Sequence, residues 1–300
     1  MSNTTLRKKI SKNIFFYAML LPVILYFLVF SYYPLLLGIH TSFHQVRLLG
    51  GATFVGFDNY VAFWNHPQFQ QAMVNTIVVG VVSFALQFLA ALVLSVMINE
   101  IRVKFFKSSV QTVTYLPHLL SWAIVGGLWI NLLSPNGFVN SLLRELHGPG
   151  FSSIVFMAEP RFARAIMILS GAWKNVGFTI VLLLAAIVSV DQGMYEAAHI
   201  DGASRIKQIQ RITIPSIIPT MKVVIMLGTM GLLRNFDQIY IMSRATIDPQ
   251  VRNMLVWIFV QGIERFQLGL ATAAASFVLA ATLVLTFAVR KLIRYDQSYE

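Results

Sequence analysis

Apolar and polar residues follow one another along the chain in long blocks, without the short periods of a surface helix or strand. Six apolar blocks are each long enough to supply the ~20 helical residues that cross a hydrocarbon core. The blocks lie at residues 15–38, 72–98, 110–133, 164–190, 221–242 and 266–288. This pattern predicts an all-α polytopic membrane protein with six transmembrane helices.

Composition supports the same class. Hydrophobic residues make up 57% of the 300 residues and charged residues 12%, whereas soluble domains carry about 25% charged residues. The chain contains no cysteine, which excludes disulfides and thiolate metal sites. The first apolar block follows a basic stretch, but it is too long for the core of a signal peptide and no small-residue cleavage site follows it.

Basic residues are distributed unequally between the connections of the six blocks. The amino end, residues 99–109 and 191–222, and the carboxyl end together hold 14 of the 23 Lys and Arg residues, against 7 in the opposite connections. Because positively charged connections stay in the cytoplasm, we expect both termini there. The polar connection after the fourth block is then cytoplasmic too.

These features predict four segments. Residues 1–14 form a cytoplasmic tail, residues 15–71 a first transmembrane helix with an external segment, residues 72–290 a core of five helices, and residues 291–300 a second tail. Within the external segment, glycines after residue 49 indicate turns and a surface helix. This segment either touches an external binding protein or caps the helix bundle.

The polar connection within the core, residues 191–219, is shaped in an unusual way for a loop between membrane helices. Gly202 separates two short amphipathic helical stretches, and we expect Pro215 and Pro219 to keep them apart from the next apolar block. Its small apolar face, suited to docking in a groove, consists of Ala197, Ala198, Ile200 and Ala203. The alternative is a helix lying on anionic lipid.

Three ionisable residues lie near the middle of predicted helices. Counting 1.5 Å per residue places His118, Lys174 and Arg234 at about half the depth of a ~30 Å core. An ionised group there costs about 2.5–3.5 kcal/mol, so each should face a partner or a watery path. Arg234 and Asp237, three residues apart on one predicted helix, either neutralise each other or stand free.

Polar and aromatic neighbours of these residues complete a candidate substrate path. Pro117, just before His118, bends the third helix and either opens a cavity or only improves packing. A surplus of positive charge, with Lys174 unpaired, would favour an acidic substrate over a neutral one, and among sugars a uronic acid. The candidate path comprises His118, Trp173, Lys174, Asn175, Arg234, Asn235, Asp237 and Gln238.

The sequence holds none of the common catalytic motifs, such as a zinc-protease or serine-hydrolase signature, and no phosphate-binding loop. We therefore predict no catalytic residues, no metal site and no ATP hydrolysis by this chain. An ion-coupled secondary transporter is the alternative mechanism. Such a transporter would show several carboxylates at mid-depth, whereas Asp237 is the only one here.

Motifs in the second half resemble the ABC importer permeases that carry the EAA signature, in their carbohydrate branch and nearest to polysaccharide and oligosaccharide permeases. The signature is Glu-Ala-Ala, three residues, Gly, nine residues, then Ile-x-Leu-Pro, with Ile214 here in place of the leucine. W-K at 173–174, F-D-Q-I-Y at 236–240 and G-F-D-N-Y at 56–60 strengthen the resemblance. The signature positions are Glu196, Ala197, Ala198, Gly202, Ile212 and Pro215.

The resemblance implies a type I importer fold in the bacterial inner membrane. It implies a second homologous permease, two cytoplasmic ATPase subunits that carry ATP and Mg, and a periplasmic or lipid-anchored solute-binding protein; membrane lipid is a further partner and nucleic acid is not. Glu196 would pair with a basic residue of an ATPase, and Asp201 and Ala203 would share the contact. A permease for amino acids, phosphate or metal is the alternative within the class.

Overall fold

The structure is a computed structural model that describes residues 13–47, 50–148, 150–243 and 247–293. Most of the two predicted tails therefore lies outside the described residues. The chain divides into two compact units, residues 1–64 with 258–277, and residues 65–257 with 278–300. Each unit is described separately.

The smaller unit begins with one long apolar helix. Its parts are α2 (Ile14–Phe27), a π-helical turn η1 (Leu28–Tyr32) and α3 (Tyr33–Ser42). Pro34, which has no N–H to donate, follows directly after the π turn, in the first turn of α3. The wider turn lets the helix continue through a residue that would otherwise interrupt it.

A β-hairpin and a short helix follow. Strands β1 (His44–Arg47) and β2 (Gly51–Phe54) pair antiparallel, with His44 opposite Phe54, and α4 spans Asp58–Trp64. The sequence predicted turns and a helix here but not the hairpin, because strands of four residues are too short to show an alternating pattern. Asn59 ties the parts together, since its amide donates to the carbonyls of Ser42 and His44 over 2.8 and 3.1 Å.

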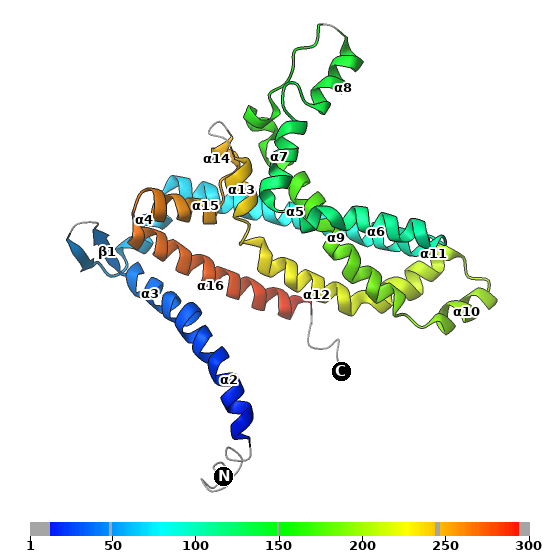
Figure 1. The fold of residues 1–300 in the computed structure, drawn as a ribbon, viewed down its shortest axis with the longest axis horizontal. Coiled ribbons are helices and arrows are strands. Elements are labelled where there is room, and N and C mark those ends of the chain that lie inside the picture. The colour runs from blue at the N-terminus through cyan, green and yellow to red at the C-terminus, as the bar shows by residue number, and fades with distance from the viewer. Residues whose placement is uncertain (1–12, 48–49, 149, 244–246, 294–300) are drawn as a thin grey trace. The chain divides into compact units, whose positions relative to one another are not determined.

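The larger unit is built on two long helices. Helices α5 (Pro67–Glu100) and α9 (Pro160–Val188) pack along each other, with α6 (Lys104–Leu119) on α9 and α12 (Ile214–Leu232) against both; Figure 1 shows α5, α6 and α9 side by side. One buried cluster of the core contains Ala91, Ile98, Ile180, Leu183, Leu184 and Val224.

Shorter elements connect these helices. They are α7 (Trp122–Leu132), α8 (Phe138–His147), η2 (Phe156–Ala158), α10 (Gln192–Ile200), α11 (Arg205–Gln208), η3 (Ile209–Thr213), α13 (Asp237–Met242) and α14 (Asp248–Val251). The chain enters the smaller unit within α15 (Met254–Phe259), continues through η4 (Val260–Glu264), and returns to the larger unit within the long helix α16 (Leu268–Leu292). Helix α8 lies within residues 134–163, the connection between the third and fourth apolar blocks.

The number of membrane spans agrees with the prediction, but two spans differ in shape. Among the described residues, five helices are long and apolar enough to cross a membrane, and α6 with α7, bent by 102° at the break between them, makes a sixth if the pair is one span. The fifth span begins at Arg205 and ends at Leu232, earlier than predicted. The expectation that Pro215 would separate this helix from the polar connection is wrong, because a π turn precedes Pro215 and the helix continues through it.

Candidate functional site

Two broken helices meet in the larger unit. The third span breaks between Leu119 and Trp122, and the helix of the fifth span ends at Leu232, before a non-helical break that leads to α13 at Asp237. The helices that follow these breaks, α7 and α13, pack against each other. Non-helical backbone is tolerated at membrane depth only where it is buried in protein or lines a water-filled cavity, and a pocket lies beside these breaks.

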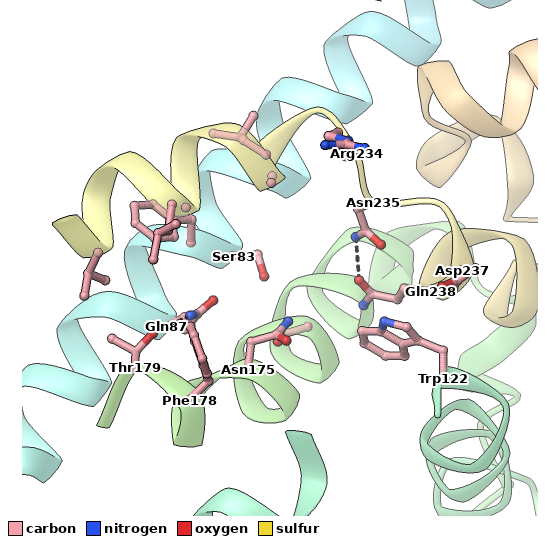
Figure 2. A pocket seen from close by; sticks show the side chains of 18 of the residues that line it. Ser83, Gln87, Trp122, Asn175, Phe178, Thr179, Arg234, Asn235, Asp237 and Gln238 are labelled. Carbon is pink, nitrogen blue, oxygen red and sulfur yellow. Dashed lines mark hydrogen bonds between the residues drawn. The ribbon is translucent and has the colours of Figure 1, made fainter. Parts of the chain in front are cut away.

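The pocket has a volume of about 340 Å³, within the usual ~300–1,000 Å³ of small-molecule sites. Helices α5, α9 and α12 form its walls together with the fifth-span break, and Trp122 adds the start of α7 (Figure 2). Its polar side chains are mostly amides and hydroxyls, and several aromatic rings lie between them. The polar and aromatic lining residues are Ser83, Phe84, Gln87, Trp122, Asn175, Phe178, Thr179, Arg234, Asn235, Phe236, Asp237 and Gln238.

A hydrogen-bonded network holds the break of the fifth span. The Gln238 amide donates to the carbonyl of Met167 over 2.6 Å and to Ser170 Oγ over 2.8 Å. Its oxygen accepts from Asn235 Nδ2 at 2.7 Å, and Asn253 Nδ2 donates to the Asn235 carbonyl. Gln238 is buried and bonded to α9. It therefore holds the non-helical backbone that precedes α13 in place on the uninterrupted helix α9.

Arg234 and Asp237 do not share one helical face, as the sequence predicted that they would. The helix ends before Arg234, and Asp237 begins α13, so the helical spacing of the two residues is lost. Figure 2 shows them apart, with Asn235 between them. Among the described residues neither makes a salt bridge, and Arg234 is the only Lys or Arg that lines the pocket.

Lys174 is placed differently from the prediction. Its side chain is 6% exposed, and its ammonium donates to the carbonyls of His118 and Pro117 over 3.0 and 3.4 Å. It is not among the residues that line the pocket. The ammonium of Lys174 is therefore bonded to the bent third span instead of facing this pocket, because the bent span supplies backbone acceptors that the sequence pattern does not show.

His118 and Trp173 also lie off the pocket. The His118 ring stacks on Phe178, with centroids 5.1 Å apart, and its Nδ1 has no hydrogen-bond partner among the described residues. Trp173 packs edge-on against Trp129 at 6.1 Å. Of the predicted path, the pocket thus includes Asn175, Arg234, Asn235, Asp237 and Gln238.

Sequence reasoning missed the polar residues that α5 contributes. Ser83 and Gln87 lie four residues apart in the second apolar block, as Asn175 and Thr179 do in the fourth, and all four line the pocket. Gln87 Nε2 donates to Thr179 Oγ1 over 2.9 Å. Paired polar residues at a spacing of four within an otherwise apolar span share one helical face, so this spacing was the available signal.

The EAA-like connection has a defined end to its first helix. Gly202 has φ of +71° and follows the last turn of α10. Its N–H donates to the carbonyl of His199 over 3.0 Å, and the N–H of Ala203 donates to that of Ala198 over 2.9 Å. This is a Schellman motif, in which glycine is favoured because other residues are strained at positive φ.

The outer face of the connection is exposed and its inner face is anchored. Tyr195 Oη hydrogen-bonds Thr213 Oγ1 at 2.8 Å, and Ile212 is buried in a cluster with Ile217, whereas Ile200 is 85% exposed. Of the predicted coupling residues, Ala198 and Ala203 are half-buried. The predicted coupling residues that are exposed are Glu196, Ala197, Asp201, Gly202 and Pro215.

Known proteins are similar to this chain in sequence and in fold. The permease protein YteP of the polygalacturonan/rhamnogalacturonan transport system of Bacillus subtilis is 31% identical over 95% of this chain and 89% of its own length. A chain from the crystal structure of a bacterial ABC transporter involved in the import of the acidic polysaccharide alginate has a TM-score of 0.88 and 34% identity, covering 97% of this chain and 98% of that chain. A chain from the alginate ABC transporter in complex with its alginate pentasaccharide-bound periplasmic protein has a TM-score of 0.87 and 34% identity, covering 96% of each.

A family description matches most of the chain as well. Residues 87–295 match the binding-protein-dependent transport system inner membrane component. The matched region includes the EAA-like connection and both broken spans. This chain therefore belongs to that family, and it is a multi-pass ABC permease subunit of the type I fold rather than an enzyme.

Proposed function

We propose that this chain is one of two permease subunits of an ATP-driven importer of oligosaccharides, including uronate-containing ones. The pocket at the two broken spans carries the proposal. Amides and hydroxyls match the hydroxyls of a sugar, and aromatic rings match its apolar faces. Arg234 supplies the cation that a carboxylate recognises.

The names of the relatives support this substrate class. Both YteP and the alginate importer carry names that specify polymers of acidic sugars. The pocket of the present chain holds one cation, Arg234, together with the carboxylate of Asp237, whereas Lys174, the expected surplus cation, lies elsewhere. We therefore assign selectivity for acidic over neutral sugars to Arg234.

The energy for transport enters through the EAA-like connection. We place this connection in the cytoplasm, where the exposed face of α10 and Gly202 docks into a groove of an ATPase subunit. ATP and Mg bind on that partner, and this chain binds neither. Closure of the ATPase pair moves α10 and α11, and the continuous helix from Arg205 to Leu232 transmits the motion to the pocket in an alternating-access cycle.

The test uses the whole complex, namely this chain, its partner permease, the ATPases and the binding protein, in proteoliposomes. Uptake is measured for a galacturonate trisaccharide and for its methyl-esterified, neutral form. Arg234→Met should lower uptake of the acidic form by about tenfold, the effect of losing one charge-assisted contact, and leave the neutral form within about twofold. Equal loss of both forms would contradict the role of Arg234, and uptake driven by an ion gradient without ATP would overturn the proposal.

A further inference from the structure

The break in the third span leaves backbone carbonyls that need donors. The last carbonyls of a helix lack their usual partners within it. Those of Pro117 and His118 belong to the final turn of α6, where the N–H of Leu120 already donates to the Pro117 carbonyl over 3.3 Å. Lys174 supplies a charged donor to both, at 3.4 and 3.0 Å. A cation at a helix carboxyl end is also favoured by the helix dipole.

The same ammonium contacts an aromatic ring on its other side. Lys174 Nζ lies 5.5 Å from the ring centroid of Trp122, within the ~6 Å range of a cation–π interaction. Trp122 is the first residue of α7, where the side chain of Ser121 caps the helix by accepting from the N–H of Ile124. The helix cap fixes the backbone of Trp122, and Lys174 restrains its ring.

Trp122 lines the pocket whereas Lys174 does not. Figure 2 shows the indole of Trp122 on the same side of the pocket as the Gln238 amide. Any effect of Lys174 on a bound molecule must therefore pass through Trp122. The positions on α9 explain this division, since Gly171, Asn175 and Phe178 point to the pocket, while Gly177 packs on the backbone of Thr114 in α6.

We propose that Lys174 is a positioning residue that holds the Trp122 indole as a stacking platform for a sugar ring in the pocket. The inference rests on the proposed function. The indole presents an apolar face, which contacts the apolar face of a sugar whatever its charge. Lys174 consequently governs affinity for acidic and neutral oligosaccharides alike, and Arg234 alone distinguishes them.

The experiment measures apparent KM and kcat for ATP-dependent uptake of the galacturonate trisaccharide and its neutral methyl ester by the reconstituted complex. Lys174→Gln retains a neutral donor for the carbonyls but removes the cation from the ring. We expect it to raise KM for both trisaccharides by about threefold to tenfold, the range that a desolvated cation–π contact supplies, with kcat within about twofold. Lys174→Arg, which keeps a cation, should restore KM to within about twofold of the wild-type value.

A double-mutant cycle separates positioning from a general structural role. Trp122→Ala should raise KM at least as much as Lys174→Gln, and the double variant should match Trp122→Ala to within about twofold, because the two residues act as a unit. Trp173→Ala is the matched control, since Trp173 neighbours Lys174 in the chain but does not line the pocket; its KM should be unchanged.

Three results would overturn the inference while wild-type uptake is normal. These are a KM increase confined to the acidic trisaccharide, additive effects of the two substitutions, and an unchanged KM for Trp122→Ala. A wild-type complex that imports neither trisaccharide would instead overturn the proposed function itself.

Discussion

The N–H of Ala203 donates a hydrogen bond to the carbonyl of Ala198 over 2.9 Å, across the left-handed turn at Gly202. This bond joins the end of α10 to the residue that leads into α11. The amide of Gln208 adds a second restraint by donating to the carbonyl of Ala203 over 3.1 Å. The two short helices of the connection are therefore linked and can act as one lever, which the proposed energy transfer from an ATPase would require.

Substituting the glycine in this turn should break the link. Gly202→Pro forces φ to about −65° and removes the N–H that binds the His199 carbonyl. We expect the complex to assemble and hydrolyse ATP, while uptake per ATP falls by about tenfold or more because the lever is distorted. Parallel ATPase and uptake assays in proteoliposomes check this. Gly127→Ala, with no atom near the added methyl group, is the control, and undiminished uptake by the proline variant would refute the lever.

Tyr195 anchors α10 to the helix that continues into the membrane. Tyr195→Phe removes only the hydroxyl that bonds Thr213 Oγ1 at 2.8 Å. The buried hydroxyl of Thr213 then lacks this partner. The loss is worth about 1 kcal/mol, so we expect transport coupling to fall by about twofold to fivefold with the amount of complex unchanged. The same assays apply, with Tyr17→Phe on exposed α2 as the control. A coupling ratio equal to wild type would show that α10 does not depend on this anchor.

Asn75 holds the segment before α15, residues 249–252, by hydrogen bonds. Its amide donates to the carbonyls of Pro249 and Arg252, each over 3.0 Å, and its oxygen accepts from Arg164 at 3.0 Å. Asn75→Ala leaves the carbonyls of Pro249 and Arg252 and the guanidinium of Arg164 without these hydrogen bonds inside the protein. The substitution should lower the free energy of unfolding by about 2–4 kcal/mol. The measurement is the apparent Tm in detergent together with protease cleavage of residues 247–253. Asn136→Ala, at an exposed position, should change neither, and an unchanged Tm for Asn75→Ala would show that these hydrogen bonds are dispensable.

Gly177 sets the close approach of α9 to α6. A methyl group there would lie 2.2 Å from the carbonyl oxygen of Thr114 and 2.6 Å from Tyr115 Cα. Since both are backbone atoms, the helices must separate, at a cost of about 1–3 kcal/mol. Gly177→Ala should lower the apparent Tm in detergent relative to Gly127→Ala. Equal Tm values for the two variants would indicate that α6 moves aside freely.

The expected orientation is open to a direct measurement, because the natural chain contains no cysteine. A single cysteine at Gln210→Cys, exposed in the EAA-like connection, should react with a membrane-impermeant maleimide only after the cytoplasmic side is opened. Asn136→Cys, exposed after α7, should react in intact cells. The reverse pattern would invert the topology that basic residues indicate.

Apolar block length was sufficient to predict six spans, because the bilayer imposes one requirement on every crossing helix. Pro117 indicates a bend in the third span. The size of the bend, 102°, also depends on the hydrogen-bond donor that Lys174 of α9 supplies to the carbonyls at the end of α6. The fifth span begins earlier than the sequence predicts, because a proline such as Pro215 usually interrupts a helix. A π turn that absorbs proline leaves no mark in a single sequence.

The site was predicted in part for similar reasons. Asn175, Arg234, Asn235, Asp237 and Gln238 are unusual for their depth, and polarity alone identified them. Lys174 looked the same in sequence, yet it binds carbonyls of another helix. Whether a buried charge faces a cavity or a backbone depends on tertiary contacts that no residue count contains.

The bent third span also bears on how the protein is made. Its two pieces have 16 and 11 residues, so they extend only ~24 and ~17 Å, each short of a ~30 Å hydrocarbon core. The carbonyls of Pro117 and His118, in the last turn of the first piece, gain the Lys174 ammonium only after α9 has been synthesised, since chains emerge amino end first. During biogenesis the insertion machinery must therefore shelter this pair of half-helices until the fourth span arrives to complete it.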